Sequence, residues 1–211
     1  MDLSMVGYHA SVHDLNSYGK AFFNENKVFQ VFVGTNRRLL VPNTEGIAKL
    51  LRTREGITVV VHAPYTVSLC KNPADPIFIA TLQYLVEVAK RYDELGVKYL
   101  VTHIGGRSKD NTIGEASTYI WEFCRRWLKM TEGCNIHLCL ENDTGSKGGT
   151  KMGYIPVLAS IVKKLNDPRL RMTYDSEHAY GAGFNPSDNN FSILDKYVDV
   201  VHWNSVPSIV S

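Results

Sequence analysis

The histidines and carboxylates of the chain recur at one kind of position, and this placement predicts a metal centre. Five of the seven histidines lie at or just past the carboxyl ends of predicted strands: His9, His62, His103, His178 and His202. Two carboxylates, Glu141 and Asp175, occupy the same kind of position. Random placement would scatter such side chains over helices and loops as well. We therefore interpret the set as a metal cluster rather than as separate structural residues.

The donor types narrow the choice of metal. Imidazole and carboxylate ligands without a thiolate suit Zn²⁺, Mn²⁺ or Fe²⁺. The candidates exceed what one ion needs, so we expect two or more metals. Glu141 ends the middle strand of the set and is the natural bridge between two ions about 3.5–4 Å apart, the spacing used for in-line attack on phosphate. Of the other histidines, His137 is expected to be a buried, hydrogen-bonded core residue and His13 to face solvent.

The elements that must position these residues alternate along the chain as short β-type runs and longer helical stretches. Strands are predicted to end at His9, Gly34, His62, His103, Glu141, Asp175 and His202. Continuous apolar runs such as Phe29–Val33 and Val198–Val201 predict strands buried on both faces, as in a parallel sheet covered by helices. Apolar spacings of three and four residues predict amphipathic helices over Ile77–Leu95, Ile113–Leu128 and Tyr154–Leu165.

Seven such units in series predict an α/β fold, a TIM (β/α)₈-type barrel with about seven βα units present and the eighth strand missing. A doubly wound open sheet is the alternative, but its GxGxxG motif does not follow the first strand. No linker divides the chain, so residues 1–211 are expected to form a single domain, with Thr144–Gly153 as a loop. In a parallel barrel all strand carboxyl ends meet on one face, where active sites are built.

Composition and charge exclude several other classes of protein. The 211 residues are 44% hydrophobic and 21% charged, which rules out a largely disordered chain. No apolar run could span a membrane, and the first residues lack the features of a signal peptide, so we expect a cytoplasmic protein without a membrane partner. The four cysteines lack CxxC spacing and are expected to be reduced thiols, with Cys139 in the core. A net charge of +2 neither demands nor excludes a nucleic-acid partner.

Six segments around these residues together resemble the endonuclease IV family, the zinc-dependent apurinic/apyrimidinic endonucleases with a (β/α)₈ barrel. The segments are VGYHAS around His9, VHAPY around His62, THIGG around His103, LENDTGSKGG around Glu141, YDSEHAYGAG around Asp175 and His178, and VVHWN around His202. They cover essentially the whole chain in order. VHAPY and DxxH are weak motifs singly, but together with the LEN-T-G segment they are specific.

The resemblance implies a three-zinc site and a role for each matching residue. His62, His103 and Glu141 resemble the ligands of the first zinc. Glu141 as bridge, with Asp175 and His202, resembles part of the second site, and His178 resembles one ligand of the third.

The resemblance also implies a substrate and a reaction. Arg37 and Tyr65 match positions that the family inserts into or stacks against DNA, and we assign His9 to DNA binding with them. The implied partner is double-stranded DNA with an abasic site. The implied reaction is hydrolysis of the phosphodiester 5′ to that site, with Glu141 as the catalytic residue.

The chain departs from the family pattern at its end. It stops nine residues after His202, where the family continues with an Asp-x-His pair and a strand ending in a Glu ligand. Ser205 also replaces an acid of the family's strand-seven ending. We therefore expect one or two metals in this chain rather than three. A fragment of a longer enzyme, a second chain that completes the barrel, or a degenerate relative without cleavage would each account for the difference; the intact motifs favour a fragment.

Two other functions remain open at this point. The first is a sugar isomerase or epimerase, since xylose-isomerase-like barrels share this fold and a His/Glu/Asp metal site. The second is a non-catalytic protein that binds metal or DNA. Arg37, Tyr65 and the Asp175–His178 pair favour the nuclease. Binding of DNA should then weaken steeply with salt, through basic residues expected on the active face: Arg37, Arg38, Arg107, Lys147 and Lys151.

Overall fold

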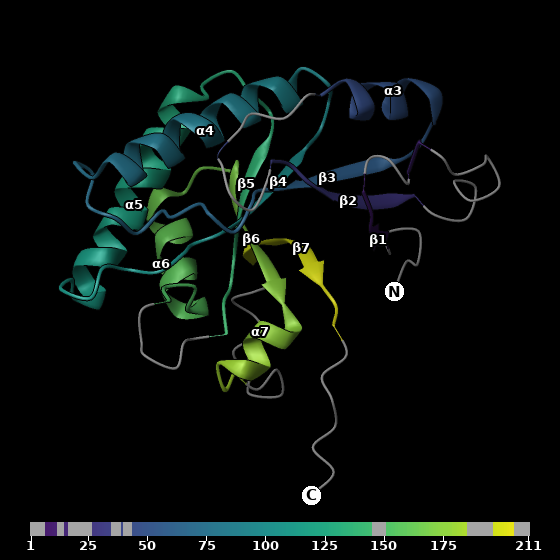
Figure 1. Ribbon diagram of the computed structural model, residues 1–211. Helices are drawn as coiled ribbons and strands as arrows, with labels where there is room; N and C mark the ends of the chain where they lie inside the picture. Colours follow the sequence, from purple (N-terminus) through teal and green to yellow (C-terminus); the bar gives the residue numbers. More distant parts are fainter. Residues whose placement is uncertain are drawn as a thin grey trace, which may run out of the picture.

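Seven parallel strands, hydrogen-bonded in sequence order, form the central sheet (Figure 1). The computed structural model describes residues 7–11, 15–16, 27–34, 39, 44–144, 151–184 and 196–204. The strands are β1 (Gly7–His9), β2 (Val28–Phe32), β3 (Thr58–His62), β4 (Tyr99–His103), β5 (His137–Glu141), β6 (Leu170–Asp175) and β7 (Val198–His202). Every neighbouring pair is parallel, which is the arrangement of a (β/α) barrel wall.

In the described part of the chain, five helices connect these strands: α3 (Glu45–Thr53), α4 (Pro76–Asp93), α5 (Ile113–Met130), α6 (Ile155–Leu165) and α7 (Ser176–Gly181). Local chemistry sets their ends. Asp75 caps α4 by accepting a hydrogen bond from the Ile77 amide at 2.8 Å. Thr112 and Glu115 form a reciprocal capping box at the start of α5. In space, α4 packs against α5 and α5 against α6, along one side of the sheet (Figure 1).

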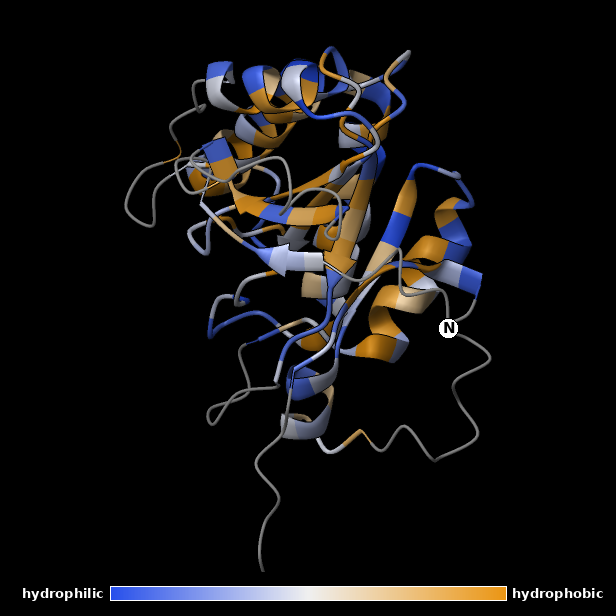
Figure 2. Ribbon diagram, turned by 90° about the vertical axis from the view of Figure 1, so that its right-hand side faces the viewer, coloured by the Kyte–Doolittle hydropathy of each residue, from blue (hydrophilic) through white to orange (hydrophobic). Residues whose placement is uncertain are grey.

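Strands β3, β4 and β5 bury apolar side chains on both faces. One set of alternate residues, including Val61, Leu100 and Leu138, belongs to the large core shared with the helices. The other set forms a small inner cluster of Val60, Val101 and Cys139. Figure 2 shows the apolar residues along the strands and on the helices beside them. This double burial is the physical reason for the continuous apolar runs of the sequence, since each face has its own partner.

The inner face changes from apolar to polar at the carboxyl ends of the strands. Because side chains alternate with a period of two, the inward position after Val60 is His62, and the one after Val101 is His103. The register pairs His103 with Glu141 and Asp175 with His202. The fold therefore gathers polar residues from five strands at one end of the sheet.

Most expected strand ends are confirmed, and the exceptions have physical causes. Six of the seven predicted ends match, whereas β2 ends at Phe32 and Gly34 already adopts a positive φ of 101°. The expectation that β7 is buried on both faces is wrong, since Val201 is exposed. Within the described residues β7 has a single strand neighbour, β6, and β1 likewise has only β2. None of the helices in the described part of the chain is long and apolar enough to cross a membrane.

Two of the remaining expectations concern cysteines and histidines outside the predicted cluster. The four cysteines are free, and Cys139 is buried as predicted. His137 is hydrogen-bonded, with its Nδ1 2.7 Å from Oδ2 of Asp199, but it is half-buried rather than part of the core. This contact lies at the amino end of β5, at the opposite end of the strand from Glu141. His13, Arg37, Arg38 and Lys147 lie outside the described residues.

The packing of α5 against α4 predicts a strong effect at Trp127. This side chain is fully buried and donates a hydrogen bond from Nε1 to the carbonyl of Leu85 at 3.2 Å. We expect Trp127→Ala to lower the free energy of unfolding by about 3–5 kcal/mol, measured by urea denaturation. Met130→Ala, at an exposed position on the same helix, should change it by no more than about 0.5 kcal/mol. Equal effects of the two variants would contradict the assigned core.

Candidate metal centre

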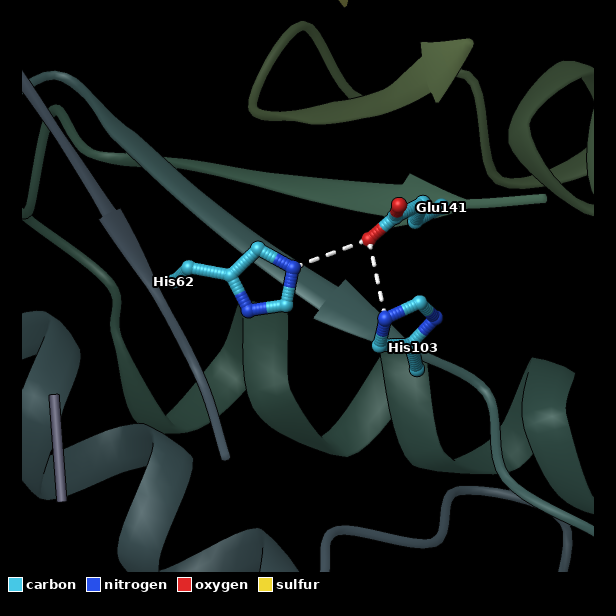
Figure 3. Close-up of side chains that lie close together, drawn as sticks. All are labelled: His62, His103 and Glu141. Atoms are coloured by element: carbon cyan, nitrogen blue, oxygen red, sulfur yellow. Dashed lines mark hydrogen bonds and ion pairs between the residues drawn. The ribbon is translucent and has the colours of Figure 1, made fainter. Parts of the chain in front are cut away.

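Two histidines from neighbouring strands face one oxygen of Glu141. His62 Nε2 lies 2.9 Å and His103 Nε2 3.4 Å from Glu141 Oε2 (Figure 3). All three side chains are buried, and their ligand atoms lie within 4.8 Å of one another. The other nitrogen of His62, Nδ1, is 2.6 Å from the carbonyl oxygen of Ala63. A carbonyl oxygen only accepts, so Nδ1 carries a hydrogen, and Nε2, which faces Glu141, is the nitrogen that could bind a metal in place of its contact with that carboxylate.

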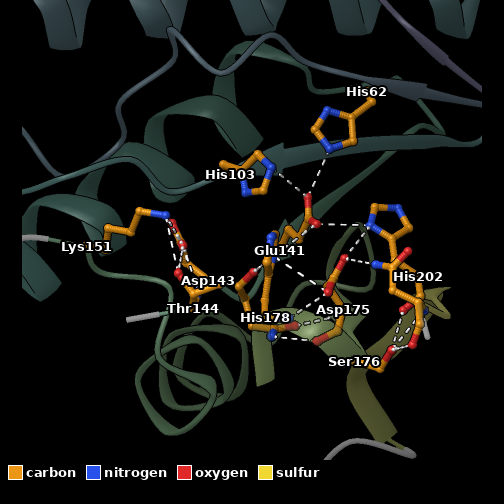
Figure 4. A network of polar contacts seen from close by, with 12 residues as sticks. His62, His103, Glu141, Asp143, Thr144, Lys151, Asp175, Ser176, His178 and His202 are labelled. Atoms are coloured by element: carbon orange, nitrogen blue, oxygen red, sulfur yellow. Dashed lines mark hydrogen bonds and ion pairs between the residues drawn. The ribbon is translucent and has the colours of Figure 1, made fainter. Parts of the chain in front are cut away.

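The second oxygen of Glu141 faces a second group. Nδ1 of His202 lies 3.0 Å from Glu141 Oε1 and 3.5 Å from Asp175 Oδ2 (Figure 4). The ligand atoms of Glu141, Asp175 and His202 also lie within 4.8 Å of one another. One carboxylate thus belongs to two buried groups of three.

Asp175 is held in place by two asparagines. The Asn142 amide nitrogen donates to the Asp175 carbonyl at 3.0 Å, and the Asn142 amide oxygen accepts from the Asp175 backbone at 2.7 Å. Asn204 donates to Oδ2 of Asp175 at 2.9 Å. The carboxylate therefore keeps one orientation toward His202, as a metal ligand requires.

His178 lies beside the two groups without joining either. Its Nδ1 is 3.6 Å from Glu141 Oε1 and 3.8 Å from Asp175 Oδ1, and it lies 3.0 Å from the carbonyl oxygen of Asn142. Its backbone amide donates to Asp175 Oδ1 at 2.8 Å, which caps the start of α7. The assignment of His178 to a third metal stays a prediction.

Two histidines of the centre, His103 and His202, have pKa values shifted in opposite directions. Burial lowers the pKa of His103 to about 4, so its ring is neutral at pH 7 and ready to bind a metal. Burial alone would also lower the pKa of His202, but its hydrogen bonds to Asp175 and Glu141 outweigh burial and raise that pKa to about 9. Burial opposes ionisation of Glu141, yet hydrogen bonds from His202 and His62 hold the pKa of its carboxyl well below the usual range. At pH 7 protonated His202 therefore compensates buried carboxylate charge, and a metal bound to this nitrogen would have to displace that proton.

This donor set fits a divalent metal. Each group combines imidazole and carboxylate donors, which suit zinc or manganese. The group of His62, His103 and Glu141 matches the three protein ligands of catalytic zinc sites, which leave one position open. The buried carboxylates, held by hydrogen bonds from their neighbours, supply the negative charge that a cation needs in a dry site.

A hollow of about 310 Å³ adjoins the first group at His103. It is lined by Tyr65, His103, Gly105, Gly106, Asp143, Lys151 and His178. The exposed ring of Tyr65 stacks on His103, with centroids 4.8 Å apart. Lys151 donates to Oδ1 of buried Asp143 at 2.6 Å, and an antiparallel bridge to Gly106 holds its backbone in place. The hollow therefore offers an aromatic face and a cation next to the candidate metal ligands.

The residues predicted to contact DNA differ in where the structure places them. His9 lies next to His202, with ring centroids 5.2 Å apart, and Tyr65 lies at the hollow. Arg107 instead donates to backbone carbonyls of its own loop, at Ser108, Lys109 and Asn111. Arg37 lies outside the described residues, so its role stays a prediction.

Three residues of the site were missed from the sequence: Gln30, Asn142 and Asp143. Gln30 is buried and contacts both His9 and His202. A polar residue inside the apolar run FQVFV was the available signal, since a buried amide needs partners. Asn142 and Asp143 directly follow Glu141, and this adjacency could have suggested supporting roles.

The arrangement defines an α/β barrel wall with a candidate metal centre at its carboxyl end. A family model described as xylose isomerase-like TIM barrel matches residues 27–210. The chain therefore belongs to this family, and the predicted fold class is confirmed.

Curated relatives connect the chain with endonuclease IV in particular. A protein of Mycoplasma mobile named probable endonuclease 4 is 32% identical over 155 residues, which are 69% of this chain and 52% of the relative. A protein of Mycoplasmopsis synoviae with the same name is 28% identical over 219 residues, covering 94% of this chain and 76% of the relative. The resemblance expected from the sequence is thus confirmed. The chain spans about half the length of the first curated relatives it matches.

Solved structures share the fold. Endonuclease IV from Thermus thermophilus matches with a TM-score of 0.71 and 23% identity, over 93% of this chain and 74% of that chain. A D-tagatose 3-epimerase-like protein matches with a TM-score of 0.71 and 19% identity, over 95% and 76%. At these identities the likeness concerns the fold alone, and the function must be argued from the site.

The sharing of Glu141 predicts how metal content responds to substitution. Glu141→Gln should remove most bound metal, because both groups lose a charged ligand. Asp175→Asn should lose metal from the second group only and retain the first. Zinc or manganese per chain, measured by elemental analysis after loading and dialysis, checks both expectations.

Glu122→Gln is the matched control for these variants. Glu122 forms ion pairs with Arg125 and Arg126 on α5 and belongs to neither group of candidate ligands. Its metal content should equal that of the wild type. Full metal content in Glu141→Gln would show that Glu141 is not a shared ligand.

Proposed function

We propose that this chain is a metal-dependent endonuclease that hydrolyses the phosphodiester 5′ to an abasic site in double-stranded DNA. The observation that carries the proposal is the single carboxylate of Glu141 shared by two buried groups, His62/His103 and Asp175/His202. Paired metal sites of this kind are used for in-line displacement at phosphate. The names of the curated relatives, probable endonuclease 4, support the same reaction class.

Different residues of the site would have different roles in such a reaction. His62, His103, Glu141, Asp175 and His202 would hold a divalent metal, which would supply Lewis acidity and lower the pKa of a water to about 7. Glu141 bridges the two groups and is the residue on which catalysis depends, and Asn142 and Asn204 keep Asp175 aligned with it. Tyr65 presents an exposed aromatic face beside His103, where a sugar or base next to a missing base can stack.

A sugar epimerase is the second candidate, because the D-tagatose 3-epimerase-like structure matches the fold as well as endonuclease IV does. An epimerase also uses an acid/base pair placed across the sugar. Asp143 is the carboxylate that lines the hollow among the described residues, and Lys151 engages it in an ion pair. Asp143 is therefore engaged by Lys151 and is not free to act as an acid or base on a sugar, which favours the nuclease.

Cleavage of a defined duplex tests the proposal. The chain loaded with zinc or manganese is incubated with a labelled duplex that carries one abasic site and with the same duplex without it. We expect cleavage 5′ to the abasic site only, leaving a 3′-hydroxyl, and at least 100-fold less with Glu141→Gln. Binding without cleavage would point to a non-catalytic DNA-binding protein. Epimerisation of ketohexoses in place of cleavage would establish the second candidate.

Lys151 predicts a salt-dependent effect on DNA affinity. Its ammonium group lines the hollow, and we expect it to contact a backbone phosphate of the substrate. Lys151→Met should weaken binding of an abasic duplex and reduce the slope of log K against log salt concentration by about one. Fluorescence anisotropy over a range of salt concentrations measures this slope.

Lys98→Met serves as the control, because Lys98 directly precedes the amino end of β4, at the opposite end of the strand from His103. Its salt slope should equal that of the wild type. An unchanged slope for Lys151→Met would show that Lys151 does not contact phosphate.

A further inference from the structure

Gln30 is a buried amide in the middle of β2 whose two ends contact different histidines. Its Oε1 lies 2.9 Å from Nε2 of His202, and its Nε2 lies 3.0 Å from Nε2 of His9. The side chain is 6% exposed. It therefore joins the first strand to the last described strand, through a residue that belongs to neither group of metal ligands.

The position does not need a polar residue for packing. Gln30 pairs in register with Val60, which belongs to the inner apolar cluster with Val101 and Cys139. An apolar side chain of the same length would continue that cluster, whereas a buried amide costs free energy unless its hydrogen bonds are satisfied. The two histidine contacts are what satisfies them, so the amide is matched to the histidines.

The polarity of the amide decides which nitrogen of His202 can bind a metal. A carboxamide oxygen only accepts, so Nε2 of His202 must carry the hydrogen in this contact. Nδ1 is then the nitrogen left for ligation, and it is the atom that faces Glu141 at 3.0 Å and Asp175 at 3.5 Å. The opposite amide orientation would place the hydrogen of a neutral ring on Nδ1 and block it as a ligand.

We propose that Gln30 is a positioning residue of the second metal group: it holds His202 in the tautomer that presents Nδ1 and so sets the metal affinity of that group. The inference rests on the proposed metal centre. The other end of the amide orients His9: the amide nitrogen of Gln30 donates to Nε2 of His9 and keeps the hydrogen of the neutral ring on Nδ1. His9 thereby becomes a hydrogen-bond donor on the exposed first strand, linked through one amide to His202.

Metal titration of three variants tests the assignment. Gln30→Met keeps the length of the side chain and removes the acceptor. It should weaken metal binding at the second group by 10- to 100-fold, the usual effect of losing such a partner, while the group of His62, His103 and Glu141 keeps its affinity. Gln30→Glu retains an acceptor for Nε2 of His202 and should restore the second affinity. Gln83→Met, an exposed glutamine of α4, is the control and should match the wild type.

Nitrogen-15 NMR of the histidine rings in the zinc-loaded wild type gives a second readout, which does not depend on how a variant folds. We expect His202 to carry hydrogen on Nε2 and to bind metal through Nδ1. Three results would each overturn the inference while the metal centre stands. The first is hydrogen on Nδ1 of His202, the second is equal zinc affinity in Gln30→Met and the wild type, and the third is a Gln30→Glu variant that binds as weakly as Gln30→Met. A wild-type chain that binds no metal would instead overturn the metal centre and this inference together.

Discussion

The site depends on one buried carboxylate. Glu141 is 1% exposed, and its two oxygens face histidines from three different strands. An ionised carboxyl at this depth without partners would be costly, so its neighbours must supply positive charge or hydrogen bonds. Protonated His202 and the hydrogen-bonding ring of His62 provide them in the metal-free protein. The same arrangement makes the site receptive to cations, because a metal can take over the role of the proton.

The barrel wall explains why this carboxylate and its partners meet. Parallel strands in sequence order bring their carboxyl ends to one edge, and the alternation of side chains directs every second residue inward. A one-residue slip of β5 against β4 would turn Glu141 outward and Leu140 inward, into a polar cluster. The outer core shared with α4, α5 and α6 fixes this register, since Leu138 and Leu140 must remain against the helices. Packing of the outer face of the sheet against the helices therefore keeps the candidate metal ligands on the inner face.

This relation also explains what could be predicted from the sequence. The strand ends and the cluster of His62, His103, Glu141, Asp175 and His202 follow from two local patterns, apolar runs and the residue that ends each run. The contacts of Gln30 and the Lys151–Asp143 pair depend instead on which side chains meet across the barrel or between loops. No local pattern encodes such meetings: Gln30 and His202 are separated by 172 residues. The exposure of β7 also escaped prediction, because burial of an apolar run depends on neighbours outside the run.

The shared carboxylate has a consequence for how the two metal groups behave together. A cation held by His62, His103 and Glu141 would draw electron density from Glu141 and weaken it as an acceptor for His202, which would favour loss of the His202 proton. That loss would make Nδ1 of His202 available as a ligand of the second group, provided that Nε2 keeps its hydrogen toward Gln30. Repulsion between two cations opposes this effect, and the negative charges of Glu141 and Asp175 offset the repulsion. The hydrogen bond between Gln30 and Nε2 of His202 would therefore have its largest effect on binding of the second cation. His202 would then have to lose its proton from Nδ1, the nitrogen that faces the carboxylates.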